Sequence, residues 1–332
     1  MSNNIREPAL SMEAMQLEKP AGNEGPGLPT RRALRNPRST SRRSTWTNYL
    51  YIVPIFLFII GFIYFAIIYT FYVSTLNWDG LSDVKIAVGL KNFVQIFQDP
   101  IFFGSLRNTA LFAILTISLQ MILGLTMALL LRTQVALKTV YKTIFFLPVV
   151  LAPAVIAYVF RHILDANQGE LNQFLAAIHL GSFAQSWLAD PRFALFALIG
   201  INVWEWTGFS FILYYAALTI LDETLIEAAR IDGASSLQTV WHVIFPLLRS
   251  TNFSLVILGV IGSLKTFDIV WLTTGGGPGR ATEFLPTYIY KKTILEFNAG
   301  YSAALSVLLL LIALVITIIQ LRAYQRQGGT NA

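Results

Sequence analysis

Glu205, Lys265 and Asp268 are charged side chains inside stretches that are otherwise apolar enough to cross a membrane. A charge inside a bilayer is costly, so such a residue usually faces another charge, another helix or a water-filled pathway. Lys265 and Asp268 are three residues apart, which predicts that they share one face of a continuous helix and could neutralise each other. Ion pairing and pathway lining are equally supported for that pair. Glu205 has no cation nearby in sequence, which favours a cavity or an interhelical partner.

Polar and aromatic residues accompany these charges. Asn202 lies three residues before Glu205, with Trp204 and Trp206 on either side of the glutamate, and Ser263 precedes Lys265. Aromatic rings beside polar groups suit a sugar, although a tryptophan near the end of a span is also a common interfacial anchor. We therefore expect a substrate pathway lined by Asn202, Glu205, Ser263, Lys265 and Asp268.

Residues for metal, nucleotide or nucleophilic chemistry are sparse. The chain has no cysteine, and His162, His179 and His242 are too far apart in sequence to suggest a metal site. The glycine-rich stretch 275–279 resembles a phosphate loop only superficially, because no Gly-Lys dipeptide occurs anywhere in the chain. The scattered acids also argue against a membrane-embedded enzyme. We expect no catalytic residue, cofactor, bound metal or nucleic-acid partner.

The elements that position the charged residues are membrane-length apolar runs. Of 332 residues, 55% are hydrophobic and 13% are charged, whereas a soluble domain has roughly 25% charged residues. About 20 helical residues cross the hydrocarbon core, so each run of that length predicts a transmembrane helix. Six are expected: Tyr49–Leu76, Asn108–Leu131, Thr143–Ile163, Phe193–Ile220, Phe253–Leu272 and Ala303–Leu321. The third contains Pro148 and Pro153, which predict either a passive kink or a mobile gate.

The region before the first run, residues 1–48, is polar and basic with five prolines, which predicts a disordered tail. Its paired arginines could signal export, but the full-length span that follows carries no cleavage site, so we expect a retained cytoplasmic tail. Lysine and arginine are more numerous in the segments on the tail's side of the membrane. This bias predicts that both termini and the loop 221–250 are cytoplasmic. The permease domain is expected to span residues 49–325 and to include this loop.

Loop 221–250 has the pattern of two short helices joined by a tight turn. Asp222 and Glu223 stand where a helix would begin and where negative charge is favourable. Gly233 can turn the chain at positive φ without strain. An apolar stripe restarts beyond it, and Pro246 limits the second helix. An exposed turn at Gly233 could fit a cleft in another protein, although an ordinary connecting loop has the same periodicity.

The residues of this loop resemble the EAA loop of ABC-importer permeases. Glu227-Ala228-Ala229 is followed by Asp232-Gly233-Ala234-Ser235 and, thirteen residues after the glycine, by Pro246. The pattern is similar to the carbohydrate-uptake branch, of the maltose and glycerol-3-phosphate type. It departs from that pattern at Val240, where an aromatic is usual, and at Ser250, where a second proline is usual. The loop would couple to the ATPase through Glu227, Ala228, Ala229, Asp232, Gly233, Ala234 and Pro246.

Weaker matches to the same family lie in order along the chain. They are Gly89–Phe93, Asn108-Thr109, Phe145–Pro148, Gly169–Asn172, Thr274–Pro278 and Gly300–Ala304. The resemblance covers about residues 49–322. It implies an all-α membrane protein with six transmembrane helices and the type I ABC importer permease fold.

The resemblance implies that the chain is a permease subunit of a sugar importer in the plasma (inner) membrane and that it is not an enzyme. Its partners would be ABC ATPase subunits, a second permease subunit, an extracellular solute-binding protein and the lipid bilayer. Glu227 would contact the ATPase, Gly233 would form the turn, and Asp232 would cap or orient the second helix. Import of glycerol phosphate or another polyol stays open. An ion-coupled carrier is less favoured, because internal repeats and paired midspan carboxylates are not evident.

Overall fold

The computed structural model describes residues 43–133 and 136–328. The chain divides into two compact units, residues 1–55 and 56–332, and the described part of the first belongs to helix α1 (Arg43–Ile59). Most of the predicted tail, up to residue 42, lies outside the described residues. Its last six residues are helical, because α1 begins at Arg43.

Four helical segments are long and apolar enough to cross a membrane. The first, Tyr51–Ser74, runs through the second half of α1, η1 (Ile60–Tyr64) and α2 (Phe65–Ser74). The other three are α4 (Pro100–Arg132), α8 (Ala194–Ile220) and Ala299–Gln325 of α15 (Ala299–Gly328). Two bent helix pairs bring the number to six if each pair is one span: Lys138–Val150 with Pro153–Ile163, and Ser236–Leu247 with Arg249–Lys265. The predicted all-helical membrane architecture is confirmed.

Shorter elements connect these segments. The only strands in the described residues, β1 (Leu76–Asn77) and β2 (Ile86–Ala87), form an antiparallel pair. The remaining helices are α3 (Lys91–Phe97), α5 (Lys138–Phe146), η2 (Leu147–Val150), α6 (Pro153–Ile163), α7 (Glu170–Ala177), η3 (Gly181–Phe183), α9 (Glu223–Ile231), α10 (Ser236–Thr239), η4 (Val240–Ile244), α11 (Phe245–Leu247), α12 (Arg249–Lys265), α13 (Asp268–Thr273), α14 (Leu285–Tyr290) and η5 (Lys291–Leu295).

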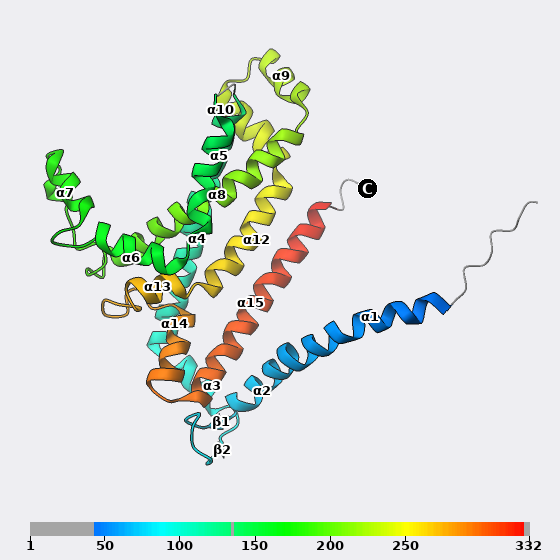
Figure 1. The fold of residues 1–332 in the computed structure, drawn as a ribbon, viewed down its shortest axis with the longest axis vertical. Coiled ribbons are helices and arrows are strands. Elements are labelled where there is room, and N and C mark those ends of the chain that lie inside the picture. Colours follow the sequence, from blue (N-terminus) through cyan, green and yellow to red (C-terminus); the bar gives the residue numbers. More distant parts are fainter. Residues whose placement is uncertain (1–42, 134–135, 329–332) are drawn as a thin grey trace, which may run out of the picture. The chain divides into compact units, whose positions relative to one another are not determined.

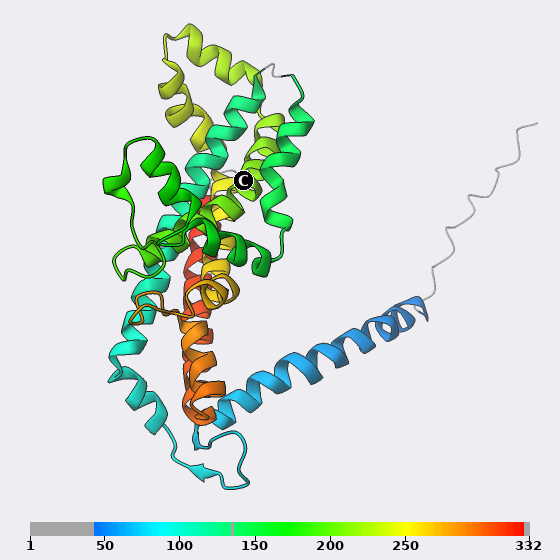
Figure 2. The same cartoon turned by 60° about the vertical axis from the view of Figure 1, so that its left-hand side comes forward.

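Within the second unit, α8 packs along α4, and α12 packs against α4 as well. Figures 1 and 2 both place α9 and α10 at one end of this group and β1, β2 and α3 at the other. Buried apolar side chains form three clusters along it. One of them joins Leu125 of α4, Phe211 of α8, Ile226 of α9 and Leu255 of α12. The loop helix α9 is therefore anchored to the transmembrane helices by its own apolar face.

Two glycines let helix backbones approach more closely than any side chain would allow. A Cβ atom at Gly124 of α4 would lie 2.8 Å from the Cβ of Ser210 in α8. A Cβ atom at Gly208 would lie 1.9 Å from the carbonyl oxygen of Phe145 in α5. Helices in a bilayer gain little from the hydrophobic effect, so small residues that permit close van der Waals contact hold them together. Helix α8 is thus held between α4 and α5.

The two prolines of the third span produce a sharp bend. Helix α5 ends at Phe146, Pro148 lies in the 3₁₀ turn η2, and Pro153 is the first residue of α6. The axes of Lys138–Val150 and Pro153–Ile163 differ by 96°. Proline removes a backbone donor and clashes with the preceding turn, which accounts for the break. Whether the bend moves during transport stays a prediction.

We expect Gly208→Ala to lower the midpoint of thermal unfolding in detergent strongly, because the new methyl group forces the Phe145 backbone away. Overpacking of this kind costs about 1–3 kcal/mol. Gly200→Ala, in the same helix, is the matched control, because a Cβ atom at Gly200 would have no neighbour within 4 Å. This substitution should leave the unfolding midpoint unchanged or raise it slightly. Equal midpoints for the two variants would contradict the close contact between α8 and α5.

Candidate transport site and coupling loop

A cavity of about 350 Å³ lies between α4, α8, α12 and α13. All five side chains predicted from the sequence to line a pathway contribute to its wall: Asn202, Glu205, Ser263, Lys265 and Asp268. Residues of four separate helical segments converge there, although they are distant in sequence. The structure thus brings the predicted set together in one space, and their contact with substrate remains a prediction.

The polar wall of the cavity contains a bridge between two helices. The Gln120 amide of α4 donates to the Asn202 side-chain oxygen at 3.0 Å and to its backbone carbonyl at 3.2 Å. Glu205, one turn further along α8, is 5% exposed and has no ion-pair partner among the described residues. A carboxyl group and two amides therefore face the cavity, together with the side chains of Ser263, Lys265 and Asp268.

The chain is broken where Lys265 and Asp268 meet the cavity. Helix α12 ends at Lys265, Thr266 is extended with ψ 112°, and Asp268 begins α13. The prediction that the two charges share one helix face is therefore wrong, and no ion pair joins them in the described chain. Each is placed favourably for its own helix, because a cation suits a helix C-terminus and an anion suits an N-terminus.

Part of the cavity wall was not predicted from the sequence. Gln120 and Thr116 of α4 line the cavity, as does Phe267 in the break. Phe267 stacks on Trp271 with ring centroids 5.9 Å apart, and Tyr290 lies 4.6 Å from Trp271. A glutamine in the middle of an apolar run was the available signal, since uncharged polar groups in a span also need partners. Nothing in the sequence placed Phe267 at a break.

Of the two tryptophans noted beside Glu205, Trp206 lines the cavity. Trp204 instead packs edge-on against Phe160 of α6, with ring centroids 5.2 Å apart. Their side chains leave α8 in different directions, as residues two apart on a helix must. Of these two tryptophans, only Trp206 is therefore placed to contact a ligand in the cavity with its ring.

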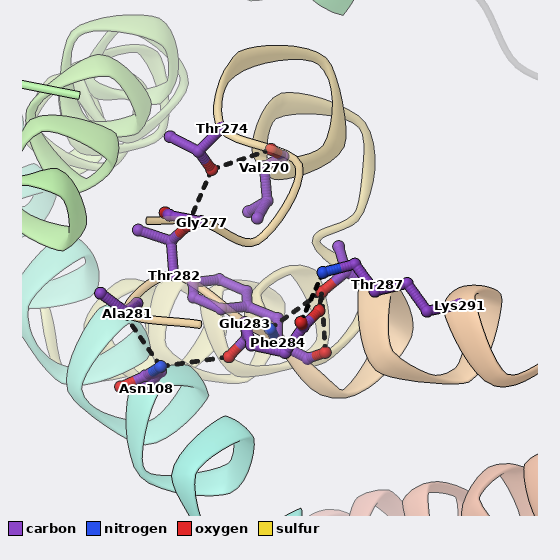
Figure 3. Close-up of polar contacts among 10 residues, drawn as sticks. All are labelled: Asn108, Val270, Thr274, Gly277, Ala281, Thr282, Glu283, Phe284, Thr287 and Lys291. Carbon is purple, nitrogen blue, oxygen red and sulfur yellow. Dashed lines mark hydrogen bonds and ion pairs between the residues drawn. The ribbon is translucent and has the colours of Figure 1, made fainter. Parts of the chain in front are cut away.

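A network of hydrogen bonds ties the glycine-rich segment 274–284 to Asn108 of α4 and Thr287 of α14 (Figure 3). The Asn108 amide of α4 donates to the carbonyls of Ala281 and Glu283 at 3.0 and 3.2 Å. The Glu283 carboxylate is almost fully buried and pairs with Lys291 at 2.6 Å. Removing one member of such a buried pair usually costs about 3–5 kcal/mol. The segment is a fixed structural loop, which agrees with the absence of a phosphate-loop motif.

Asp99 ties α4 to α14 and α15 at the end of the molecule that carries α3. Its carboxylate accepts hydrogen bonds from the hydroxyls of Tyr288 and, at 2.7 Å, Tyr301, and it caps α4 through the Ile101 amide. Although partial burial acts to raise the pKa of Asp99, these hydrogen bonds hold it below its usual range. The carboxylate therefore remains an acceptor at neutral pH.

The first half of loop 221–250 confirms the predicted helix and turn. Asp222 caps α9 by accepting from the Thr224 amide at 3.0 Å. Gly233 has φ +84°, and its amide donates to the Arg230 carbonyl while the Ala234 amide donates to the Ala229 carbonyl. This pair of bonds is a Schellman motif, which requires a left-handed residue at the position of the glycine.

The second half is capped by a residue other than the one predicted. Ser235 accepts from the Gln238 amide at 3.3 Å, and the Gln238 side chain accepts from the Ser235 amide at 2.8 Å. This capping box starts α10. Asp232 is instead the C-terminal cap of α9, so the capping role predicted for it is wrong. An orienting role for Asp232 stays a prediction.

The loop presents both charge and apolar surface. Glu227, Gly233 and Pro246 are exposed, and Ala228 is exposed beside Glu227. Ile231 is 86% exposed, whereas Ile226 of the same helix is 7% exposed and packs into the apolar cluster with α4 and α8. One face of α9 is thus anchored and the opposite face is open, as expected for an element that contacts another protein.

A buried hydrogen-bond bridge fixes the bend between the loop and α12. The Tyr214 hydroxyl of α8 donates to the Asn252 side-chain oxygen at 2.8 Å, and the Asn252 amide donates to the Phe245 carbonyl at 3.0 Å. Tyr214 is fully buried. The segments on either side of Leu248 meet at 73°. Because Pro246 cannot donate a backbone bond, side chains of neighbouring helices stabilise this bend.

Tyr214→Phe should lower the unfolding temperature, because the Asn252 oxygen loses its donor in a buried position. A lost hydrogen bond of this type costs about 1 kcal/mol. Tyr158→Phe provides the control, since Tyr158 is 67% exposed, and it should leave the unfolding temperature unchanged. If both substitutions have the same small effect, the bridge does not stabilise the bend.

Residues 120–328 match the family described as binding-protein-dependent transport system inner membrane component. The chain is 34% identical to the probable ABC transporter permease protein YurN of Bacillus subtilis, over 83% of this chain and 95% of that protein. It is 30% identical to the sn-glycerol-3-phosphate transport system permease protein UgpA of Agrobacterium fabrum, over 84% and 94%.

A solved structure shares the fold. It is a bacterial ABC transporter involved in the import of the acidic polysaccharide alginate, with TM-score 0.72, 22% identity, and coverage of 86% of this chain and 96% of that one. A further structure of such a transporter, in complex with its alginate-bound periplasmic protein, gives TM-score 0.73. With more than half of its length matched, the chain belongs to the inner-membrane components of binding-protein-dependent transport systems, the multi-pass permease subunits of ABC transporters.

Proposed function

We propose that this permease carries sugars or related polyols inward and forms one half of their pathway, with loop 221–250 as its contact to separate ATPase subunits. The observation that carries the proposal is the cavity, where amide, hydroxyl and aromatic groups meet at a helix break. Polar groups in an otherwise apolar pocket fix the orientation of a ligand. Relatives named for glycerol phosphate and alginate support a substrate rich in hydroxyls.

The energy must come from another chain, since the sequence contains no Gly-Lys dipeptide of a nucleotide-binding loop. We infer a complex with a second permease subunit, ABC ATPase subunits and an extracellular solute-binding protein. The alginate transporter crystallised with its periplasmic protein supports the last of these. The ion-coupled carrier and the membrane-embedded enzyme are set aside, because the family is one of ABC permeases.

The arrangement of α12 suggests how the loop reaches the cavity. The helix begins just after the bend at Leu248 and ends at Lys265 in the cavity wall. Its 17 residues make a rod of about 25 Å. We infer that movement of α9 against the ATPase is transmitted through the bend to α12, so that the pathway opens alternately to the two sides. The lysine and arginine bias supports a cytoplasmic position for this loop and both termini.

Reconstitution tests the proposal. The purified chain alone should neither hydrolyse ATP nor accumulate labelled sugar in liposomes. Adding the copurifying ATPase, the second permease and the binding protein should restore both activities together. Robust ATP hydrolysis by a verified single-chain preparation would contradict the proposal, as would accumulation of sugar driven by an ion gradient without ATP.

Gly233→Val should reduce sugar uptake about tenfold or more while membrane insertion is unchanged. A β-branched residue at φ +84° is strained by about 1 kcal/mol or more, and the strain falls in the loop rather than in a span. The matched variant Gly233→Asn should retain most uptake, because asparagine tolerates left-handed backbone. Glu227→Ala should be milder than Gly233→Val if neighbouring contacts hold the interface.

Crosslinking measures the same interface directly. The chain has no cysteine, so Leu237→Cys, at a side chain 68% exposed, gives a single reactive site that leaves the Ser235 cap intact. Crosslinking to the ATPase should fall in the Gly233→Val background and persist with Gly233→Asn. If Gly233→Val shows wild-type uptake and unchanged crosslinking, the loop is an ordinary connecting loop and not the contact to the ATPase.

A further inference from the structure

We propose that the cavity selects its substrate by charge: it accepts an uncharged or cationic polyhydroxy compound and rejects phosphorylated and carboxylated ones. Glu205 and Asp268 are the residues to which we assign this selection. The inference rests on the proposed function, because it concerns the substrate of the same pathway. It separates this chain from the two relatives named above, whose substrates, glycerol phosphate and alginate, are both anionic.

The charges around the cavity are unequal. Among the described residues that line it, two are acidic, Glu205 and Asp268, one is basic, Lys265, and none is arginine. No ion pair joins either carboxylate to a described cation. Like charges brought together in a desolvated site repel strongly. Since Lys265 is offset by Asp268, the described wall has no net positive charge with which to attract an anionic ligand.

Arginine, whose forked donors recognise phosphate and carboxylate most specifically, is missing from the described part of the wall. Lysine also binds phosphate, as do backbone amides at the amino end of a helix. Here the amino end of α13 already carries Asp268 in its first turn. Lys265 is the last residue of α12, where its ammonium group complements the carbonyls of its own helix. Neither helix end is arranged for an anion.

The same wall is well provided for hydroxyl groups. Carboxylate oxygens accept hydrogen bonds from hydroxyls and from ammonium groups. Asn202 and Ser263 add an amide and a hydroxyl, and Trp206 and Phe267 add aromatic rings to the lining. An aromatic ring also attracts a cation placed over its face. Neutral sugars, polyols and amino sugars all match this set.

Matched pairs of compounds test the charge selection. The transporter complex of both permeases and the ATPase, purified without the binding protein, is titrated while its tryptophan fluorescence is followed. Each pair has the same carbon skeleton: glycerol and sn-glycerol 3-phosphate, glucose and glucuronate, maltose and maltobionate, with glucosamine as the cationic member. Trp206→Phe identifies the part of the signal that arises in the cavity. In at least one pair the neutral member should bind about tenfold more tightly than its anionic mate.

Charge-neutralising variants assign the effect to residues. Glu205→Gln and Asp268→Asn, singly and together, should narrow the gap between a neutral compound and its anionic mate. Glu170→Gln is the control, since Glu170 is exposed on α7 and does not line the cavity, and it should leave the gap unchanged. A gap that persists in the double variant overturns the assignment to these two carboxylates.

Failure of the charge selection and failure of the proposed function give different results. If the anionic member binds as tightly as its neutral mate in every pair that binds to the wild-type complex, charge selection is wrong, and the sugar-importer proposal stands. If no member of any pair changes the fluorescence that depends on Trp206, both the selection and the placement of the substrate in this cavity are wrong.

Discussion

The close approach of α8 to its neighbours is the constraint on which the other features depend. Gly124 and Gly208 remove the side chains that would otherwise separate α4, α8 and α5. Once α8 is fixed in this way, Asn202 and Glu205 face the cavity, and Tyr214, more than two turns further along the same helix, meets Asn252 at the bend. The proposed substrate site and the connection to the loop are thus two positions on one helix, and a shift of α8 would disturb both.

Broken helices are tolerated here only where their freed backbone groups find partners. A bilayer offers no water to an open carbonyl, so irregular backbone at membrane depth must be buried in protein or line a cavity. The break at Thr266 and Phe267 lies in the cavity wall, and the bend at Leu248 is bridged through Asn252. Backbone groups freed at the break would be costly in lipid. In the cavity wall they are available to form hydrogen bonds with a bound substrate.

The sequence was sufficient to find the charged residues of the cavity wall, because an ionisable residue in an apolar run has few stable places to go. It was insufficient for the relation between Lys265 and Asp268, since neither glycine nor proline marks the break between them. In the loop, a turn with positive φ at Gly233 could be predicted from the residue type alone. The cap was assigned to Asp232 instead of Ser235, because both are good caps and only the end of α9 at Ile231 decides between them.

Helix α12 is the element through which we propose that the polar loop acts on the cavity. Its first turn is held by the Tyr214–Asn252 bridge and its last residue, Lys265, stands in the cavity wall. A helix with intact backbone hydrogen bonds is stiff over this length, so rotation at one end displaces the other instead of being absorbed between them. The absence of an ion pair between Lys265 and Asp268 is then consistent with movement, because α12 and α13 can separate at the break without leaving a buried charge that has lost its partner.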